Sequence, residues 1–348
     1  MKLVFVVNDV MTEKDDYTTL RLAHKAINKD HEVALVSLDA FSYENDSVVS
    51  ALSARPSGRS YKNDAELLSD LQDKKNGQHR INLNDWDAVM LRADPADELV
   101  QRPWAPSSGL LFAQLTALQG TLVLNNPFKL TDASNKTYFQ QYPRAIRPRT
   151  VITRDEFLIK QFIENEGGKA VIKPLQGSGG QGVFIVTENT GANLNQIIEA
   201  TVRDGYAIVQ EYLPKAADGD LRMITLNGQP LQVNGVYACC RRYNDSEDVR
   251  NNFSAGGSIN LVTPDKEALE VARLAGPKLK QDGMYFAGLD IVGDKMMEVN
   301  VDSAGCLNLL EDLSDCDFSG AVIDDIFHKV DLARHYGKMF TQNQLASL

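Results

Sequence analysis

A glycine-rich segment preceded by a lysine is the first feature of this sequence that could do chemistry. Residues 177–182 read Gly-Ser-Gly-Gly-Gln-Gly, and Lys173 lies shortly before them. The backbone N–H groups of such a loop can approach phosphate oxygens closely, and a nearby lysine adds a positive charge. The segment therefore predicts a phosphate-binding loop.

The residues around this loop exclude the best-known arrangements of its kind. A dinucleotide-binding loop is followed by a helix, and a P-loop by Lys-Ser or Lys-Thr. Here Val183–Val186 follows, a β-branched and aromatic run that predicts a strand. Protein kinases place their lysine after the loop rather than before it. A hairpin whose tip folds over a nucleotide remains, and a plain flexible hairpin tip is the alternative.

Two carboxylates and an amide lie in a second predicted hairpin, GLDIVGDKMMEVNV, residues 288–301. If residues 293–295 form its loop, Asp290 lies directly opposite Glu298, and Asn300 shares the face of Glu298. Like charges at this separation are destabilising unless a cation neutralises them. Mg²⁺ prefers oxygen ligands and commonly bridges to substrate phosphates. The hairpin therefore predicts a magnesium site, and a solvated hairpin with exposed acids is the alternative.

Three cations accompany these motifs. Lys136 follows Asn126-Pro127, Arg222 lies in a predicted strand, and Arg250 leads into a glycine turn. A single arginine is most often a solvated surface residue. Arg222 and Arg250 have a stronger claim to function, because each lies next to a structured turn or strand.

Alternating strands and helices are expected in the first part of the chain, residues 1–127. The strands are predicted at residues 3–7, 31–38, 87–91 and 121–124, with a first helix at 18–26. This alternation is typical of a parallel sheet with helices on its faces. Residues 48–84 are polar and poor in large apolar side chains, so we expect an inserted loop there.

A second unit is expected from residue 128. Its predicted elements are helices at 134–142, 156–166 and 195–203, and strands at 149–153, 170–173, 183–186 and 207–214. From residue 220 onward the chain predicts strands, the first two of them joined by Asn227-Gly228, a strong hairpin signal. Apolar residues at helical spacing predict a helix at 321–336.

The composition is that of a globular protein. Of 348 residues, 43% are hydrophobic and 24% charged, which suggests two or three domains. The net charge of −11 argues against nucleic acid as a partner, and no apolar run is long enough to span a membrane. The four cysteines lack C-x-x-C spacing and the five histidines lack metal-binding spacing. We therefore expect a reducing, cytoplasmic setting, with Cys239 and Cys240 in buried packing.

Taken in order, the motifs resemble the ATP-grasp carboxylate–amine ligases and, within them, the bacterial glutathione synthetases. The resemblance is carried by Leu91–Pro95, Asn125–Pro127 with Asn135-Lys136, Ile172–Leu175 with 177–180, Gln210–Pro214, Asp218–Arg222, Arg250–Asn252 with Ala255–Gly257, Gly288–Asp294 and Glu298–Val301.

This resemblance implies a fold and a division of the chain. It implies an α/β fold of the ATP-grasp type, in which two α+β subdomains clamp ATP. The implied parts are an N-terminal parallel-sheet domain at 1–127, an ATP-grasp domain at 128–315 with its lid at about 149–213, and a C-terminal helical segment at 316–348.

The resemblance also implies a mechanism and a role for each site residue. The γ-phosphoryl group of ATP would pass to a substrate carboxylate, and an amine would attack the resulting acylphosphate. Arg222 and Arg250 would stabilise the developing charge. ATP would be bound by Lys136, Lys173, Gly177, Ser178, Gly179, Gly180, Glu211, Tyr212, Leu213 and Asp220. Two Mg²⁺ ions would be held by Asp290, Glu298 and Asn300, and the substrates by Arg92, Asn252, Gly256, Gly257, Asp302 and Ser303.

One loop departs from the family pattern. After Glu-x-Asn-Val the family usually reads Thr-Ser-Pro-Thr, whereas residues 302–306 are Asp-Ser-Ala-Gly-Cys. The family's loop lies beside the acceptor amino acid, so an added carboxylate would disfavour glycine unless a cation compensates it. Three hypotheses stay open: a ligase that joins γ-glutamylcysteine to glycine, a related ligase with another amine acceptor, and an ATP-binding regulatory protein without turnover. Small-molecule substrates are expected, and the resemblance suggests a homo-oligomer.

Overall fold

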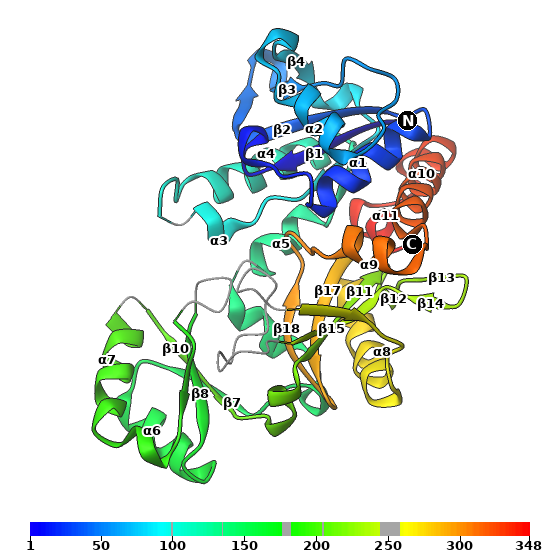
Figure 1. Ribbon diagram of the computed structural model, residues 1–348. Coiled ribbons are helices and arrows are strands. Elements are labelled where there is room, and N and C mark those ends of the chain that lie inside the picture. The colour runs from blue at the N-terminus through cyan, green and yellow to red at the C-terminus, as the bar shows by residue number, and fades with distance from the viewer. Residues whose placement is uncertain (99, 134, 176–181, 204, 244–257) are drawn as a thin grey trace.

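The computed structural model describes residues 1–348 except 99, 134, 176–181, 204 and 244–257. The described residues form two six-stranded sheets, a four-stranded sheet and a two-stranded hairpin, with helices packed against them. Figure 1 shows the N-terminal sheet above, the C-terminal sheet below it, and the four-stranded sheet as a lobe to one side. The arrangement is mixed α/β, as the sequence predicts.

The N-terminal sheet contains the four predicted strands, and all four are parallel. Its order is β4 (His79–Asn82), β3 (Val49–Ala54), β2 (Glu32–Tyr43), β1 (Lys2–Val7), β5 (Ala88–Leu91) and β6 (Leu122–Leu124). The pairs β1–β2, β1–β5 and β5–β6 are parallel, which confirms the predicted parallel core.

Both faces of this sheet are buried, which explains the unbroken apolar run in β1. Leu3, Phe5 and Val7 pack in one cluster with residues of α1 (Thr18–Asn28) and α10 (Phe318–Tyr336). Val4 and Val6 point to the opposite face and pack with residues of α4 (Ala105–Leu118). Successive side chains of a strand alternate between faces, so helices on both sides require apolar residues at every position.

The prediction of an inserted loop at 48–84 is wrong. This segment contains β3, α2 (Asp64–Leu71) and β4, and the two strands extend the sheet in antiparallel fashion. Small residues such as Ala51 and Ser53 are buried in β3 although the stretch has few large apolar side chains. Main-chain pairing to β2 gives this edge its order, and composition does not report such pairing.

The predicted helix at 134–142 is confirmed as a shorter 3-10 helix, and an α-helix that was not predicted precedes it. The α-helix α5 (Pro127–Ala133) begins earlier, with proline at the first position, where a missing N–H costs nothing. A short 3-10 helix, Lys136–Gln141, follows, and the side chain of Asn135 accepts a hydrogen bond from the Thr137 N–H at its start. Lys136 is therefore fixed at the first position of a capped turn.

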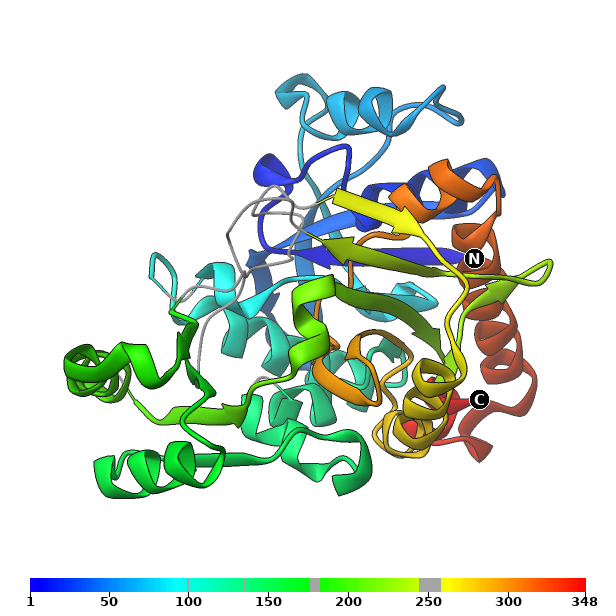
Figure 2. The same cartoon turned by 60° about the horizontal axis from the view of Figure 1, so that its bottom comes forward.

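The four-stranded sheet has the order β7 (Thr150–Thr153), β10 (Ala207–Glu211), β8 (Ala170–Pro174) and β9 (Phe184–Val186). Helices α6 (Glu156–Asn165) and α7 (Leu194–Arg203) cover one face, packing with Ile172, Ala207 and Val209. The predicted strands and helices of this region are confirmed within a residue or two, except that the strand predicted at 207–214 ends at Glu211. Figure 2 shows this lobe projecting to one side of the rest of the molecule.

The C-terminal sheet has the order β16 (Ser258–Leu261), β15 (Cys239–Tyr243), β11 (Asp220–Leu226), β17 (Phe286–Val292) and β18 (Lys295–Asn300). The predicted Asn227-Gly228 turn joins β11 to β12 (Gln229–Pro230), and β13 (Gln232–Val233) and β14 (Val236–Tyr237) form a second hairpin. Leu221 and Met223 pack with residues of α8 (Lys266–Gln281), so Asp220 and Arg222 point to the other face.

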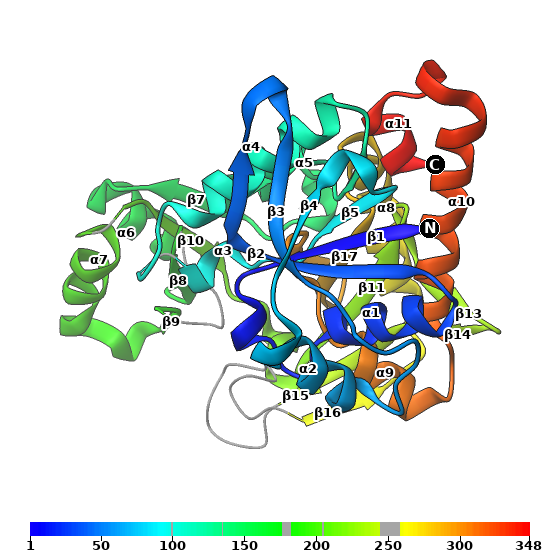
Figure 3. The ribbon, with the colours of Figure 1, turned by 90° about the horizontal axis from the view of Figure 1, so that it is seen from above.

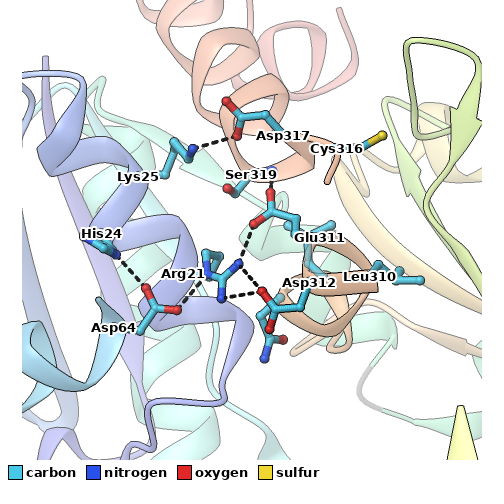
Figure 4. A network of polar contacts seen from close by, with 12 residues as sticks. Arg21, His24, Lys25, Asp64, Leu310, Glu311, Asp312, Cys316, Asp317 and Ser319 are labelled. Atoms are coloured by element: carbon cyan, nitrogen blue, oxygen red, sulfur yellow. Dashed lines mark hydrogen bonds and ion pairs between the residues drawn. The ribbon is translucent and has the colours of Figure 1, made fainter. Parts of the chain in front are cut away.

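The C-terminal helices join the two large sheets. Helices α9 (Leu307–Ser314), α10 and α11 (Gln342–Ser347) follow β18, and α10 runs beside the N-terminal sheet (Figure 3). Arg21 of α1 donates to Asp64 of α2 at 2.7 Å and to Glu311 of α9 at 2.9 Å (Figure 4). The chain that follows β18 is thus fastened to the first helix. Among the described residues, the helices are too short or too polar to cross a membrane.

Candidate active site

The hairpin of β17 and β18 brings together the predicted carboxylates. Asp290 is paired with Glu298, as predicted, and Gly288 with Asn300. The predicted three-residue loop is wrong by one residue, because Val292 pairs with Lys295 and only residues 293 and 294 form the turn. A two-residue turn suits the twist of a hairpin, and Gly293 has the positive φ of 58° that such turns require. A bulge between Asp290 and Ile291 then restores the predicted register.

Asp290 lies in a buried network with arginines from two neighbouring strands. Arg222 of β11 donates hydrogen bonds to both carboxylate oxygens of Asp290. The bond from Nη2 of Arg222 to Oδ2 of Asp290 is 3.0 Å long. Arg242 of β15 lies 2.9 Å from Oδ2, and Asn300 Nδ2 donates to the same oxygen at 3.3 Å. Arg242 also pairs with Asp220 of β11. Two carboxylates and two guanidinium groups thus alternate across β15, β11 and β17.

Two opposing effects set the pKa values of the carboxyl groups in this network: burial raises them, and the neighbouring arginines lower them. Burial alone would raise the pKa of Asp290, but Arg222 and Arg242 together lower it below the ordinary value. The pKa of Asp220 is raised, mainly by burial and then by the charge of Asp290, although Arg242 opposes the shift. Asp290 is therefore the firmly ionised member of the network.

A second group of charges lies where the lobe meets β18. Lys173 of β8, Lys136 and Glu298 line a small cavity of about 50 Å³ together with Ile208 and Gln210 of β10. Because Ala207 and Val209 face α6 and α7, Ile208 and Gln210 must face this cavity. Burial lowers the pKa of Lys173; the charge of Glu298 opposes this, and that of Lys136 adds to it. The two lysines and Glu298 are therefore electrostatic neighbours.

A larger cavity of about 580 Å³ opens next to the first. Lys136 and Glu298 line both cavities, and Asn300, Asp302 and Ser303 line the larger one. Its opposite wall comes from Pro106, Leu110, Leu111 and Gln114 of α4, which the sequence did not suggest. The two cavities therefore adjoin one another between the lobe, β18 and the N-terminal unit.

The acid of the atypical loop faces another acid. Asp302 and Asp94 both line the larger cavity. Burial raises the pKa of Asp302 to about 7, and the charge of Asp94 adds to the shift. The pKa of Asp94 is likewise raised, by burial first. Asp302 therefore carries only part of its charge near neutral pH.

Some predicted site residues lie beside the cavities rather than in them. Arg92 is 4% exposed, donates to the carbonyl of Ala304 at 2.7 Å, and lies over the ring of Phe286. The Arg92 guanidinium thus holds the loop at 302–306 through its main chain. Burial lowers the pKa of Arg92 to about 10. The Glu211 carboxylate accepts a hydrogen bond from the Arg149 N–H at 2.8 Å, on the face of the lobe away from the cavity.

Several predicted site residues lie outside the described part of the chain. They are Gly177, Ser178, Gly179, Gly180, Arg250, Asn252, Gly256 and Gly257.

Tyr212 and Leu213 follow directly after β10, and the ammonium of Lys169 lies 3.6 Å from the centre of the Tyr212 ring.

The oxygen donors of β18 fit a magnesium ion that is shared with a nucleotide. Among the described residues no cluster of three or more His, Cys, Asp or Glu forms a protein-only metal cage. Mg²⁺ rarely needs one, because it commonly takes one or two carboxylates and completes its shell with water and phosphate oxygens. Glu298 is exposed toward the cavities, and Asn300 lies beside it. Asp290 contributes negative charge next to them.

Arg242 is a charged residue of the site that the sequence did not suggest. It is 4% exposed and contacts both Asp220 and Asp290. The signal was present in the strand Ala-Cys-Cys-Arg-Arg, since alternation puts Cys240 and Arg242 on one face. A charged residue on a buried strand face needs a partner of opposite charge.

Comparisons with known proteins identify the family of this chain. The profile of the prokaryotic glutathione synthetase N-terminal domain matches residues 1–131, and that of its ATP-grasp domain matches residues 135–315. A glutathione synthetase from Vibrio vulnificus is 33% identical over 251 residues, covering 72% of this chain and 75% of the relative. One from Thermosynechococcus vestitus is 35% identical over 223 residues, covering 64% of this chain and 66% of the relative.

Solved structures show the same fold at lower sequence identity. The macrocyclase MdnC from Microcystis aeruginosa, bound to its precursor peptide MdnA, aligns over 94% of this chain and all of its own, with a TM-score of 0.61 and 15% identity. The D-cycloserine synthetase DcsG aligns over 93% of this chain and 99% of its own, with a TM-score of 0.60 and 13% identity. The fold is therefore an ATP-grasp fold. The chain belongs to the prokaryotic glutathione synthetase family and is an ATP-dependent ligase that acts on small molecules.

Proposed function

We propose that this protein joins γ-glutamylcysteine to glycine at the expense of ATP, releasing glutathione, ADP and phosphate. The observation that carries the proposal is the convergence of Lys136, Lys173 and Glu298, from three different segments, on adjoining cavities. Two cations suit the phosphates of ATP, and a carboxylate beside them suits the metal ion that travels with ATP. The family relationship supports the same assignment.

The smaller cavity is the proposed nucleotide end of the site. Ile208 offers an apolar surface and Gln210 a polar edge, as an adenine ring requires. Lys173 at the end of β8 and Lys136 at the capped turn then extend toward the phosphates. Gly177, Ser178, Gly179 and Gly180, which follow Lys173 in sequence and lie outside the described residues, are also assigned to the phosphates.

Phosphoryl transfer is proposed at the junction of the two cavities. The carboxylate of γ-glutamylcysteine attacks the γ-phosphorus, the bond to ADP breaks, and an acylphosphate forms. We assign Mg²⁺ to Glu298 and Asn300, with Asp290 adjacent, where the bound ion would neutralise phosphate charge. Arg222, oriented by Asp290, and Arg250 are assigned to the charge that develops as the amine attacks the acylphosphate.

The acceptor side is proposed around the loop at 302–306. Arg92 holds this loop by donating to the carbonyl of Ala304, so its role here is positioning rather than contact with substrate. Asp302 and Ser303 line the larger cavity, within reach of a small amine. An ionised Asp302 favours the ammonium form of the acceptor and disfavours its carboxylate.

The proposal is tested by ADP formation with Mg-ATP and γ-glutamylcysteine, with and without glycine, and by the mass of the product. Glycine-dependent ADP with glutathione as the product supports it. Absence of ADP across all pairs of candidate substrates would instead support an ATP-binding protein without turnover.

A second acceptor is favoured by one observation, the replacement of the family's Thr-Ser-Pro-Thr by a loop that begins with Asp302. The same assay with amines that lack a carboxylate separates the two possibilities. ADP formation and product mass that follow such an amine rather than glycine would move the acceptor assignment and leave the ligase chemistry in place. Asp302→Ser should then shift the preference toward glycine.

A further inference from the structure

The loop at 302–306 leads into a helix, α9, whose first turn is capped from another part of the chain. Cys306 stands at the N-cap of α9 but makes no side-chain capping hydrogen bond. The first N–H groups of a helix have no partner within the helix and need one elsewhere. Here the Leu307 N–H donates to Oγ1 of Thr18 at 3.2 Å, and both residues are buried. Thr18, the first residue of α1, therefore supplies the capping oxygen that the N-cap residue of α9 does not.

Two further contacts fasten α9 to the start of the chain. Asn308, which is 4% exposed, donates from Nδ2 to the Asp16 carbonyl at 2.7 Å. Arg21 donates to Glu311 at 2.9 Å and to Asp312 at 3.1 Å, so the second turn of α9 is held as well (Figure 4). The helix that ends the loop is thus fixed against the N-terminal unit over two turns.

The loop at 302–306 takes its position from such contacts, because it belongs to neither a helix nor a strand. Arg92 holds its middle by donating to the Ala304 carbonyl at 2.7 Å, and the Thr18 cap holds its end. Asp302 and Ser303, which line the larger cavity, lie directly before Ala304. The cap on α9 therefore bears on where these two side chains stand in the cavity.

We propose that Thr18 is a positioning residue for the amine acceptor, because its cap on α9 keeps Asp302 and Ser303 where the acceptor binds. This inference rests on the proposed function, which places the acceptor at the loop. Without the cap the loop takes other positions, and only the fraction in the native position binds the acceptor. Loss of one buried hydrogen bond shifts such an equilibrium by about tenfold. A bound acceptor restores the position of the loop, so the change falls on KM rather than on kcat.

Three full-length variants test the role of the hydroxyl. Thr18→Val removes it and keeps the shape of the side chain, whereas Thr18→Ser keeps it. Thr201→Val on α7 is the matched control, because that buried hydroxyl bonds within its own helix, to the Ile197 carbonyl at 2.8 Å. Wild type and variants are assayed for ADP formation with γ-glutamylcysteine, varying in turn Mg-ATP and the acceptor that supports turnover of the wild type.

Thr18→Val should raise KM for the acceptor by about tenfold and leave kcat and KM for Mg-ATP near the wild-type values. Thr18→Ser and Thr201→Val should resemble wild type in all three constants. An unchanged acceptor KM in Thr18→Val, an equal rise in KM for Mg-ATP, or a Thr18→Ser variant as impaired as Thr18→Val would overturn the proposal.

Amide hydrogen exchange of the ligand-free proteins tests the anchor without relying on turnover. Peptides that cover residues 302–308 should exchange faster in Thr18→Val than in wild type or Thr18→Ser, because the Leu307 N–H loses its acceptor and the loop leaves its position. Equal exchange in Thr18→Val and wild type would overturn the proposal, even if turnover falls. A wild type that forms no ADP with any acceptor refutes the proposed function instead, and the exchange comparison then decides whether Thr18 positions the loop.

Discussion

At the scale of single residues, Arg242 is a charged side chain buried in the C-terminal sheet. It forms ion pairs with two carboxylates, Asp220 and Asp290. Removing one member of a buried ionic network leaves the others desolvated without a partner. The network should therefore matter to the fold as well as to the orientation of Arg222.

Arg242→Met should lower the free energy of unfolding by about 3–5 kcal/mol, the usual loss when a buried ion pair is broken on one side. The measurement is chemical denaturation followed by a structural signal. Arg241→Met is the matched control, because the neighbouring side chain points the other way and makes one long contact, at 3.3 Å to the Asp218 carbonyl. Equal losses in the two variants would contradict the assignment.

Glu298 tests the chemistry rather than the stability of the site. Glu298→Gln keeps the shape of an exposed side chain but removes its charge, so the protein should remain folded. Turnover should fall by about 100-fold or more, the scale seen when a preorganised charge-stabilising group is removed. A steady-state assay over a range of Mg²⁺ concentrations measures it, and Glu267→Gln on α8 is the control. Unchanged turnover would remove Glu298 from the metal site.

The sequence predicted the partner of Asp290 in the hairpin but not its contact with Arg242, and the difference has a physical reason. The pairing of Asp290 with Glu298 could be predicted because, in a hairpin, the length of the turn determines which residues face each other. The turn is one residue shorter than predicted, but the bulge between Asp290 and Ile291 restores the predicted pairing. Arg242 could not be paired with Asp290, because its partner depends on how β11 is placed between β15 and β17. Register between strands distant in sequence has no such local rule.

At the scale of elements, the join between α1, α2 and α9 is built on shared charges. Asp64 accepts a hydrogen bond from Arg21 and lies 2.7 Å from Nδ1 of His24 (Figure 4). The other ring nitrogen of His24 contacts the Tyr61 carbonyl. The hydrogen bond to Asp64 raises the pKa of His24 above its ordinary value, although burial opposes it. Protonated His24 thus stabilises the folded state.

This gives a pH dependence with a defined sign. Because the folded pKa of His24 is raised, its contribution is fully present below the unfolded pKa of about 6.5 and is lost as the pH rises through the folded value. The difference in unfolding free energy between wild type and His24→Gln should therefore shrink with rising pH above neutrality. Denaturation curves across this range measure it. A constant difference between wild type and His24→Gln across this pH range would contradict the argument.

The segment at 48–84 contains secondary structure that the sequence did not predict. Large apolar side chains report burial, but β3 is built from small residues that are buried because β2 and β4 flank it. The strands of the lobe were predictable because α6 and α7 bury one face and leave an alternating pattern. Periodicity therefore reports elements that are packed by side chains and misses those ordered by main-chain pairing.

At the scale of the whole molecule, the site exists only where separate parts meet. Lys173 comes from the lobe, Glu298 from the C-terminal sheet, Lys136 from the turn after α5, and Leu110 from α4. The sequence predicted the residues with local motifs but not the wall from α4, because nothing in the sequence of a helix states which cavity it will border. A ligand that touches several parts should stabilise their arrangement.

Binding of Mg-ATP should therefore raise the free energy of unfolding, by about 2.7 kcal/mol when ATP is present at 100 times its Kd. Lys173→Met should lose most of this gain, because methionine retains the apolar stem but not the charge that faces the phosphates. Without nucleotide the variant should be no less stable than wild type, since burial already disfavours the Lys173 ammonium. Thermal unfolding with and without Mg-ATP measures both effects. Lys160→Met on α6, which removes a lysine that pairs with Glu156 away from the cavities, is the control. If Mg-ATP stabilised Lys173→Met as much as wild type, the phosphates would not contact Lys173, and the nucleotide end of the site would have to be placed elsewhere.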